Sequence, residues 1–134
     1  MLLYDGLCGL CNRMVRFVVR HDHERVFRFA SLQSPFASRI LGQKRVDVSD
    51  LNSVYIVVFC GDREELLNRS EAVLFVMERL GSFWKATSRI CRLVPRSIRD
   101  WAYGWVARNR YRCFARYEAC PLPNEADRDR FVEV

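Results

Sequence analysis

The 134-residue sequence lacks long hydrophobic runs, nucleotide-binding and hydrolase motifs, and internal repeats. Its longest unbroken apolar stretch, Val54 to Cys60, is far shorter than the ~20 residues that a membrane-spanning helix needs. The first residues have neither the basic region nor the long apolar core of a signal peptide, which predicts a cytoplasmic protein. Without a G-x-G-x-x-G, Walker or Ser-His-Asp signature, we expect no organic cofactor.

The sequence also has little lysine, and its positive charge is unevenly placed. Of its 22 basic residues, nine lie in residues 85–116, together with a single acidic residue, Asp100. A concentrated basic segment attracts nucleic acid, anionic lipid or an acidic protein surface. A solvated helical face is the simpler interpretation, because a nucleic-acid module usually adds exposed aromatics or a known fold signature.

The hydrophobic pattern predicts alternating strands and helices. From Gly9 to about Arg20, apolar residues recur at helical spacing and place Cys11, Val15 and Val18 on one face. The predicted strands are Leu2–Tyr4, Val26–Ala30, Ser53–Cys60 and the hairpin return Glu64–Leu67. The further predicted helices run from Pro35 to Leu41, Glu71 to Leu80, Phe83 to Leu93 and Ser97 to Arg110.

Small polar residues, prolines and glycines indicate where the predicted helices begin and end. Ser34 before Pro35 starts one helix, which Gly42 closes, and the polar residues 43–52 form a loop. Ser70 caps the next helix, which stops at Gly81. The resulting order, β-α-β, α, β-β-α and then helices, is an α/β arrangement with a mixed sheet, and it is the order of the thioredoxin-like fold.

The length predicts one domain, residues 1–134. Within it we expect a thioredoxin-like core at 1–81, a helical extension at 82–120 and a loosely held polar tail at 121–134. The aromatic residues Trp101, Tyr103 and Trp105 of the extension are expected in a core or an interface.

The most informative motif is Cys8-Gly9-Leu10-Cys11, where a strand turns into a helix. Unpaired backbone N–H groups and the positive end of the helix dipole stabilise a thiolate at the first cysteine. The second cysteine, one turn later on the buried face, is close enough to resolve a mixed disulfide. Cys8 is therefore the predicted nucleophile and Cys11 the resolving thiol, and Gly9 leaves room for a substrate to approach the first sulfur.

Two alternatives compete with redox chemistry at this pair: a zinc site, and an inert pair. Structural zinc needs four ligands, often two such pairs, and the sequence has a single C-x-x-C. His21 and His23 are predicted on the surface, and we expect no metal. The remaining cysteines form no second pair at that spacing: Cys60 and Cys91 are expected to pack, and a third reactive thiol at Cys113 or Cys120 is the less favoured interpretation.

Asp5 precedes Cys8 by three residues in the predicted active-site turn, which also contains Tyr4, Gly6 and Gly9. Its carboxylate is expected to order the turn by accepting backbone N–H bonds. The alternative is a general base that takes the proton of Cys11 during resolution.

The stretch Tyr4-Asp5-Gly6-Leu7-Cys8-Gly9-Leu10-Cys11 resembles the Y-D-G-x-C-x-x-C opening of the DCC family of predicted thiol-disulfide oxidoreductases. Further matching segments are Arg28–Ser34, Ser70–Val73, Val94–Arg96 and Val106–Tyr111. The resemblance implies a thioredoxin-like fold, protein-disulfide reduction or exchange, and site roles for Asp5, Cys8 and Cys11. The sequence departs from thioredoxin-like enzymes at residues 46–53, which contain no proline where such enzymes place a cis-proline.

We therefore expect a thiol-disulfide oxidoreductase that acts on a disulfide-containing protein or a small thiol. The alternative is a non-catalytic binding module, in which residues 85–116 hold an acidic protein or nucleic acid.

Overall fold

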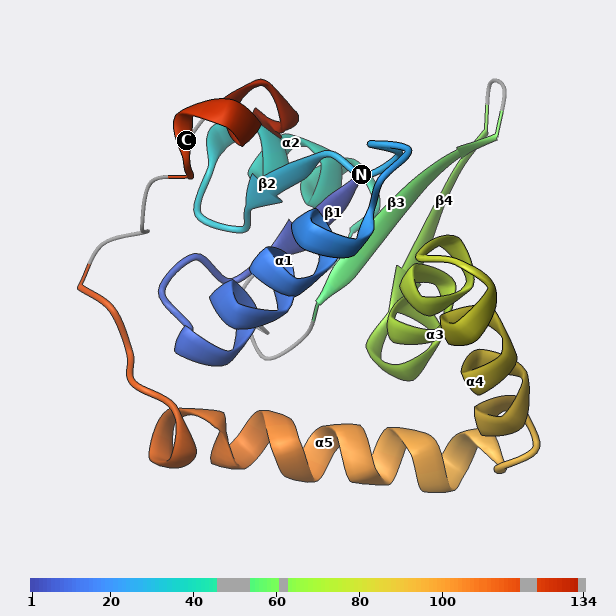
Figure 1. The fold of residues 1–134 in the computed structure, drawn as a ribbon. Helices are drawn as coiled ribbons and strands as arrows, with labels where there is room; N and C mark the ends of the chain where they lie inside the picture. Colours follow the sequence, from blue (N-terminus) through green and yellow to red (C-terminus); the bar gives the residue numbers. More distant parts are fainter. Residues whose placement is uncertain (46–53, 61–62, 119–122, 133–134) are drawn as a thin grey trace.

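Residues 1–45, 54–60, 63–118 and 123–132 are described by the computed structural model (Figure 1). Their strands are β1 (Leu2–Tyr4), β2 (Phe29–Ser31), β3 (Tyr55–Cys60), β4 (Arg63–Asn68) and β5 (Phe131–Val132). Their helices are α1 (Gly9–His21), α2 (Pro35–Gln43), α3 (Arg69–Arg79), α4 (Ser82–Arg92), α5 (Arg96–Cys113) and the 3₁₀ helix η1 (Glu125–Arg130).

The described strands form one mixed sheet in the order β4-β3-β1-β2-β5. Strand β1 lies in the middle, parallel to β2 and antiparallel to β3, and β4 returns from β3 as the predicted hairpin. All three residues of β1 are buried, as expected of a strand covered on both faces. The predicted α/β class is confirmed, and the arrangement is compatible with a thioredoxin-like core.

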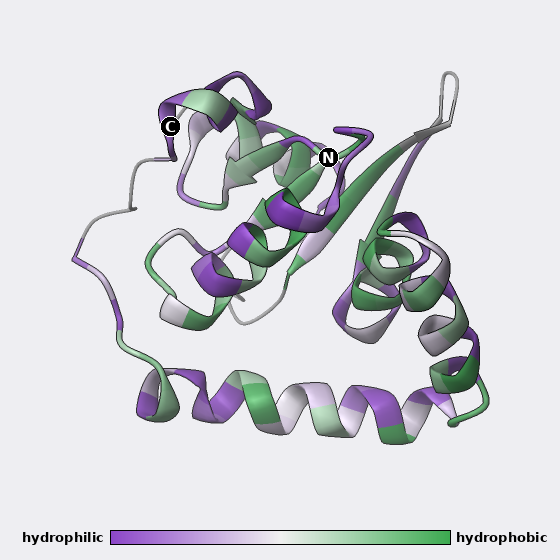
Figure 2. Ribbon diagram, in the orientation of Figure 1, coloured by the Kyte–Doolittle hydropathy of each residue, from purple (hydrophilic) through white to green (hydrophobic). Residues whose placement is uncertain are grey.

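Helices cover both faces of the sheet. On one face, α1 and α3 bury Val15, Val18 and Ala72 against Leu2 and Ile56. On the other face, α2 packs against a second cluster made of Leu3, Ala30, Leu32, Ala37, Ile40, Leu41, Tyr55 and Val57. Figure 2 shows mainly hydrophobic residues along β2 and β3, whereas α5 mixes hydrophobic and hydrophilic residues along its length.

Helices α4 and α5 extend this core, as predicted. Helix α4 packs on α3, and α5 then crosses beneath α3 and α1 (Figure 1). Polar contacts fasten α5 in place: Asp100 accepts a hydrogen bond from Ser70, and the Tyr103 hydroxyl accepts one from the Val54 N–H, 2.9 Å away. The C-terminal end of α5 is thereby brought to the N-terminal end of α1.

Strand β2 is shorter than predicted and begins later, at Phe29 rather than Val26. The buried carboxylate of Asp22 accepts hydrogen bonds from the N–H groups of Val26 and Phe27, 3.0 and 2.9 Å away. These bonds hold the segment in a loop, because backbone groups bonded to a side chain cannot also pair in a ladder. The prediction from β-branched and aromatic residues at 26–28 was wrong for that reason.

Two of the predicted helix ends are also corrected. Gly42 does not close α2, which continues to Gln43, and the backbone of Gly42 has no positive φ. Ser70 does not cap α3, because the helix begins one residue earlier and the Ser70 hydroxyl donates to Asp100 instead. Gly81 does follow α3 as predicted, with a φ of 122°, a conformation that residues with a side chain rarely adopt.

The C-terminal tail is not loosely held over its described part. Residues Phe131 and Val132 form β5, which pairs in parallel with β2, and the Phe131 ring stacks on Phe29. The guanidinium of Arg130 is buried in an ion pair with Asp22. The polar composition of the tail did not predict these contacts, because they join residues that are more than 100 positions apart in the sequence. Most of the loop predicted at 43–52 lies outside the described residues. The segment without proline, residues 46–53, lies wholly outside them.

Candidate active site

Cys8 and Cys11 lie where the turn after β1 becomes α1. Cys8 is the N-cap residue of α1, in an extended conformation, and the Cys11 N–H donates to its sulfur at 3.4 Å. This is the place where unpaired N–H groups of a helix favour negative charge. Both residues are buried, Cys8 fully and Cys11 with 5% of its surface exposed.

The two thiols have opposite pKa shifts. The hydrogen bond from the Cys11 side chain, the backbone N–H bonds and the charge of Arg110 lower the pKa of Cys8 from 9.0 to about 6. The same side-chain hydrogen bond, followed by burial and the charge on Cys8, raises the pKa of Cys11. These opposite directions favour a thiolate on Cys8 and a proton on Cys11.

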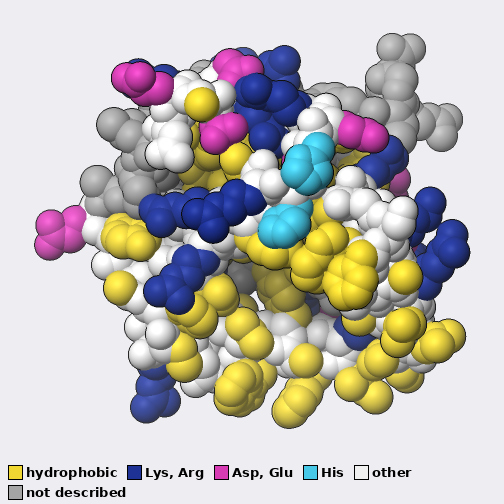
Figure 3. All heavy atoms as spheres, in the orientation of Figure 1, with side chains coloured by type: hydrophobic (Ala, Val, Ile, Leu, Met, Phe, Trp, Pro, Cys, Tyr) yellow, Lys and Arg dark blue, Asp and Glu magenta, His cyan; other side chains and the backbone are white. Residues whose placement is uncertain are grey.

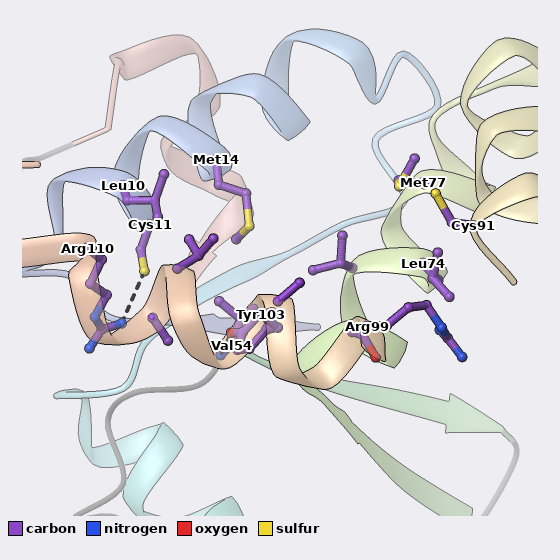
Figure 4. A pocket seen from close by; sticks show the side chains of 15 residues that line it. Leu10, Cys11, Met14, Val54, Leu74, Met77, Cys91, Arg99, Tyr103 and Arg110 are labelled. Carbon is purple, nitrogen blue, oxygen red and sulfur yellow. Dashed lines mark hydrogen bonds between the residues drawn. The ribbon is translucent and has the colours of Figure 1, made fainter. Parts of the chain in front are cut away.

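Arg110, near the end of α5, is the cation at this pair. Its Nη1 lies 3.6 Å from the Cys11 sulfur (Figure 4), and its side chain is only 3% exposed. Its Nη2 lies 3.2 Å from a carboxylate oxygen of Asp5. A buried guanidinium requires a compensating negative charge, which the Asp5 carboxylate provides.

Asp5 connects the turn to the rest of the site. One of its oxygens accepts from the Leu7 N–H and from Gln33 Nε2, at 3.0 and 2.9 Å. The other accepts from the Tyr111 hydroxyl at 2.6 Å and pairs with Arg110. Burial and the bond to Asp5 raise the pKa of Tyr111 to about 12, which keeps its hydroxyl a donor. The predicted turn-ordering contact of Asp5 is present.

The chain just after α5 covers Cys8. We call residues 114–117 the covering segment. The Gly9 N–H donates to the Ala115 carbonyl at 2.9 Å, the Tyr117 N–H donates to the Leu7 carbonyl at 2.7 Å, and Cys8 pairs with Arg116 in an antiparallel bridge. The expectation that Gly9 opens a path to the sulfur is corrected, because a Cβ at Gly9 would lie 2.4 Å from the Ala115 oxygen. Gly9 makes room for the covering segment.

A pocket of about 450 Å³, lined in part by Cys11, lies between α1, α3 and α5. Leu10, Cys11 and Met14 form its wall on α1, and Tyr103 and Arg110 line it from α5 (Figure 4). The lining is almost entirely apolar. Cys11 therefore borders a mainly apolar pocket, with the Arg110 guanidinium beside its sulfur.

Of the other residues predicted in the active-site turn, Gly6 lies at the site and Tyr4 does not. Gly6 does belong to the turn, where its N–H donates to Gln33 and its carbonyl accepts from Asn12. Tyr4 instead lies in β1, where its ring meets Phe131 edge-on in the core.

The other cysteines lie apart from the pair or outside the description. Cys91 is half-buried and lines the pocket, whereas Cys113 is exposed at the end of α5. Cys120 and the side chain of Cys60 lie outside the described residues. Among the described residues, no three His, Cys, Asp or Glu side chains come together as metal ligands.

Sequence reasoning missed four side chains at the site. Arg110, Tyr111 and Gln33 bind Asp5, and Asn12 donates to the carbonyls of Gly6 and Cys8 at 2.8 and 2.9 Å. Three of the four, Gln33, Arg110 and Tyr111, lie in segments that match the DCC family. The match alone assigned them no role in the site, because none of the three is close to the cysteines in the sequence.

Comparison with known proteins agrees with a thiol-disulfide site at the cysteine pair. Residues 2–116 match the family model of the DCC1-like thiol-disulfide oxidoreductases. The uncharacterized protein YuxK of Bacillus subtilis is 31% identical over 132 residues, which cover 98% of this chain and 93% of that protein. A chloroplastic DCC family protein of Arabidopsis thaliana is 36% identical over 122 residues, which cover 91% of this chain and 69% of that protein. No solved structure matches. The chain therefore belongs to the DCC1-like thiol-disulfide oxidoreductase family.

Proposed function

We propose that the protein exchanges thiols and disulfides through Cys8 and Cys11, with Cys8 as nucleophile. The observation that carries the proposal is the cap position of the Cys8 sulfur, which accepts a hydrogen bond from the Cys11 N–H at 3.4 Å. Membership of the DCC1-like family supports the same reaction class. A thiolate held at this position at neutral pH is the species that attacks a disulfide.

In the first step, the Cys8 thiolate attacks one sulfur of a substrate disulfide. The substrate S–S bond breaks, a mixed disulfide forms with Cys8, and the other substrate sulfur leaves as a thiolate that takes a proton from solvent. Cys8 loses its negative charge in this step. The hydrogen bond to the Cys8 thiolate and its negative charge both raise the pKa of Cys11. Both are lost when Cys8 forms the mixed disulfide, so the pKa of Cys11 falls.

In the second step, Cys11 gives its proton to water, and the resulting Cys11 thiolate attacks the Cys8 sulfur. The mixed disulfide breaks, the Cys8–Cys11 disulfide forms, and the second substrate sulfur leaves as a thiolate. Two electrons have passed to the substrate, and an external thiol or dithiol protein restores the pair. Arg110, with Nη1 at 3.6 Å from the Cys11 sulfur, stabilises the attacking thiolate.

Asp5 acts in this proposal by positioning Arg110 and the turn rather than as a base. Its two oxygens already accept from the Leu7 N–H, Gln33 and Tyr111 and pair with Arg110. A carboxylate beside a buried arginine is poorly placed to take a proton, because protonation would leave the guanidinium uncompensated.

Access to Cys8 requires the covering segment to move. The segment contacts the turn through backbone groups, the Gly9 N–H and the Leu7 carbonyl. An extended substrate chain offers the same donors and acceptors, and adding a strand to such groups is a common mode of peptide recognition. We therefore propose a disulfide-bearing extended peptide as substrate, which replaces the covering segment on the turn.

The test is a redox titration followed by thiol trapping and intact-mass measurement, with oxidised glutathione as the disulfide. The wild type should show one reversible two-electron step. Cys11→Ser should accumulate a glutathione adduct, whereas Cys8→Ser should show neither the adduct nor the step. The matched control is Cys113→Ser, which removes an exposed thiol outside the pair and should leave the step intact. An adduct on Cys8→Ser but not on Cys11→Ser would reverse the roles, and free thiols under all conditions would contradict the proposal.

A further inference from the structure

The outer surface of α4 and α5 is hydrophobic where a soluble helix is usually polar. The large apolar side chains that are more than half exposed there are Phe83 (73%), Ile90 (66%), Leu93 (83%), Ile98 (55%), Trp101 (67%) and Trp105 (54%). We call these six residues the α4–α5 outer face. On α4 the fully buried residue is Ser88, and Trp84 is the large apolar side chain that packs against the core. Exposed apolar patches of this kind mark interaction sites.

Helical spacing places these side chains in stripes. Ile98, Trp101 and Trp105 are three and four residues apart, so they line one side of α5, and Arg108 and Arg112 continue the same side. The side of α5 that carries Tyr103 and Arg110 faces the pocket instead. Figure 3 shows hydrophobic side chains gathered along the edge of the molecule where α5 runs and toward its corner with α4.

The same helices are strongly basic. Residues 85–116 contain nine basic residues and one acidic residue. Lys85, Arg89, Arg108 and Arg112 are exposed beside the outer face. Any partner must therefore bury apolar side chains and offer negative charge at the same surface.

We propose that the α4–α5 outer face docks on an anionic lipid bilayer. A bilayer surface provides an apolar layer a few ångströms below its charged headgroups, which suits helices with Trp, Phe and Leu beside Arg and Lys. Tryptophan prefers this interface, and long basic side chains reach from it to the headgroups. No helix in the described part of the chain is both long and apolar enough to cross a membrane, so the helices would lie in the interface.

Charge argues against a second copy of the chain as occupant, and the apolar side chains argue against nucleic acid. A symmetric dimer would place the same basic segment against itself, because both copies use one patch. Nucleic acid offers phosphates but leaves side chains such as Ile90, Leu93 and Ile98 exposed to water. The proposal concerns a surface away from the cysteine pair and does not depend on redox activity.

The test is flotation of the reduced full chain with lipid vesicles. Vesicles of phosphatidylcholine mixed with phosphatidylglycerol should bind the protein, vesicles of phosphatidylcholine alone should bind it weakly, and added salt should weaken binding. Tryptophan emission should shift to the blue on binding. The Ile98→Ser/Trp101→Ser variant should bind about tenfold more weakly or worse, because it loses two apolar side chains from the bilayer. The control Val26→Ser, at a half-exposed apolar residue elsewhere, should bind as the wild type does.

A second pair of variants tests the charge without touching apolar contacts. Arg108→Glu/Arg112→Glu should also lower binding about tenfold or more, since each basic residue near the surface contributes about 1 kcal/mol. The control Arg28→Glu/Arg39→Glu makes the same change at two exposed arginines of other elements. Cys8→Ser should bind normally, which separates this test from that of the redox proposal.

Three results would overturn membrane docking. The first is equal binding to both kinds of vesicle, and the second is unchanged binding of the outer-face variants. The third is an absence of binding to either kind of vesicle. If the α4–α5 outer face instead binds a second copy, an acidic protein or nucleic acid, Ile98→Ser/Trp101→Ser should weaken that association.

Discussion

Arg110 Nη1 lies 3.6 Å from the sulfur of Cys11, although 99 positions separate the two residues. The contact joins α5 of the extension to α1 of the core. The same guanidinium forms an ion pair with Asp5, whose carboxylate oxygen lies 3.2 Å from Nη2. The extension is thus part of the candidate site as well as a cover for it.

Replacing Arg110 by methionine should raise the pKa of Cys8, because the positive charge that favours its thiolate is lost. We expect a rise of about one unit, the usual size for a nearby charge. The same variant should lower the free energy of unfolding by about 3 kcal/mol, since it leaves Asp5 buried without its partner. Thiolate absorbance against pH measures the first effect, and urea unfolding measures the second.

Arg110→Lys is the matched control, because it keeps the charge but loses the planar fork that reaches both Asp5 and Cys11. In this variant the pKa of Cys8 should stay close to its wild-type value, and the free energy of unfolding should fall by less than in Arg110→Met. If Arg110→Met left the Cys8 pKa unchanged, the electrostatic role given to Arg110 would be wrong.

The stability of the reduced protein should depend on pH through the cysteine pair. Between about pH 6 and pH 9, the unfolded chain holds a proton on Cys8 that the folded chain has released. The free energy of unfolding should therefore rise with pH in this window, by at most about 1.4 kcal/mol per pH unit. It should fall above pH 9, because folded Cys11 keeps a proton that the unfolded chain loses.

Urea unfolding of the wild type at several pH values, with Cys8→Ser as reference, tests this prediction. The difference between the two proteins should be smallest near pH 5, where Cys8 is protonated in both states. A difference that does not change between pH 6 and pH 9 would contradict a low Cys8 pKa.

Asp5→Asn should preserve the attack by Cys8 but destabilise the fold. The amide cannot balance the charge of Arg110, and we expect a loss of about 3 kcal/mol in unfolding free energy. The control is Asp129→Asn, which breaks an exposed pair with Arg25 and should cost at most about 1 kcal/mol. Stopped-flow release of the substrate thiol measures resolution separately, and a selective slowing of that step alone would assign Asp5 the role of a base.

Gly9→Ala should push the covering segment off the turn. The added Cβ would lie 2.4 Å from the Ala115 oxygen, a distance that real Cβ atoms do not tolerate. We expect faster alkylation of Cys8 and a loss of about 1–3 kcal/mol in stability. Gly42→Ala is the control, because an open position inside α2 should gain about 0.5–1 kcal/mol from alanine. Unchanged alkylation of Cys8 in Gly9→Ala would mean that the segment does not limit access.

Tyr117→Pro tests the same cover without adding bulk at the turn. Proline removes the N–H that donates to the Leu7 carbonyl at 2.7 Å, whereas Tyr117→Phe keeps it. Cys8 should be alkylated several-fold faster in the proline variant and at the wild-type rate in the phenylalanine variant. Equal rates in both would show that this bond does not hold the segment closed.

Elements that depend on local pattern were predictable from the sequence. Helix α1 begins at Gly9 as expected, because its apolar face and the turn before it are adjacent in the chain. The β3–β4 hairpin is also local, since its two strands pair across a short connection. Strand β2 was misplaced because Asp22, a residue outside the apolar pattern, holds the N–H groups of Val26 and Phe27.

The C-x-x-C pair, its position at the start of a helix and the basic character of residues 85–116 can be read from the sequence alone. Each follows from neighbouring residues through hydrogen bonding and charge. In contrast, the contact of Arg110 with Cys11, the cover of residues 114–117 over Cys8 and the outward position of Phe83 and Ile90 on α4 are visible in the folded protein only. These contacts depend on how α5 crosses the core, and that crossing is set by long-range packing, which no local pattern encodes.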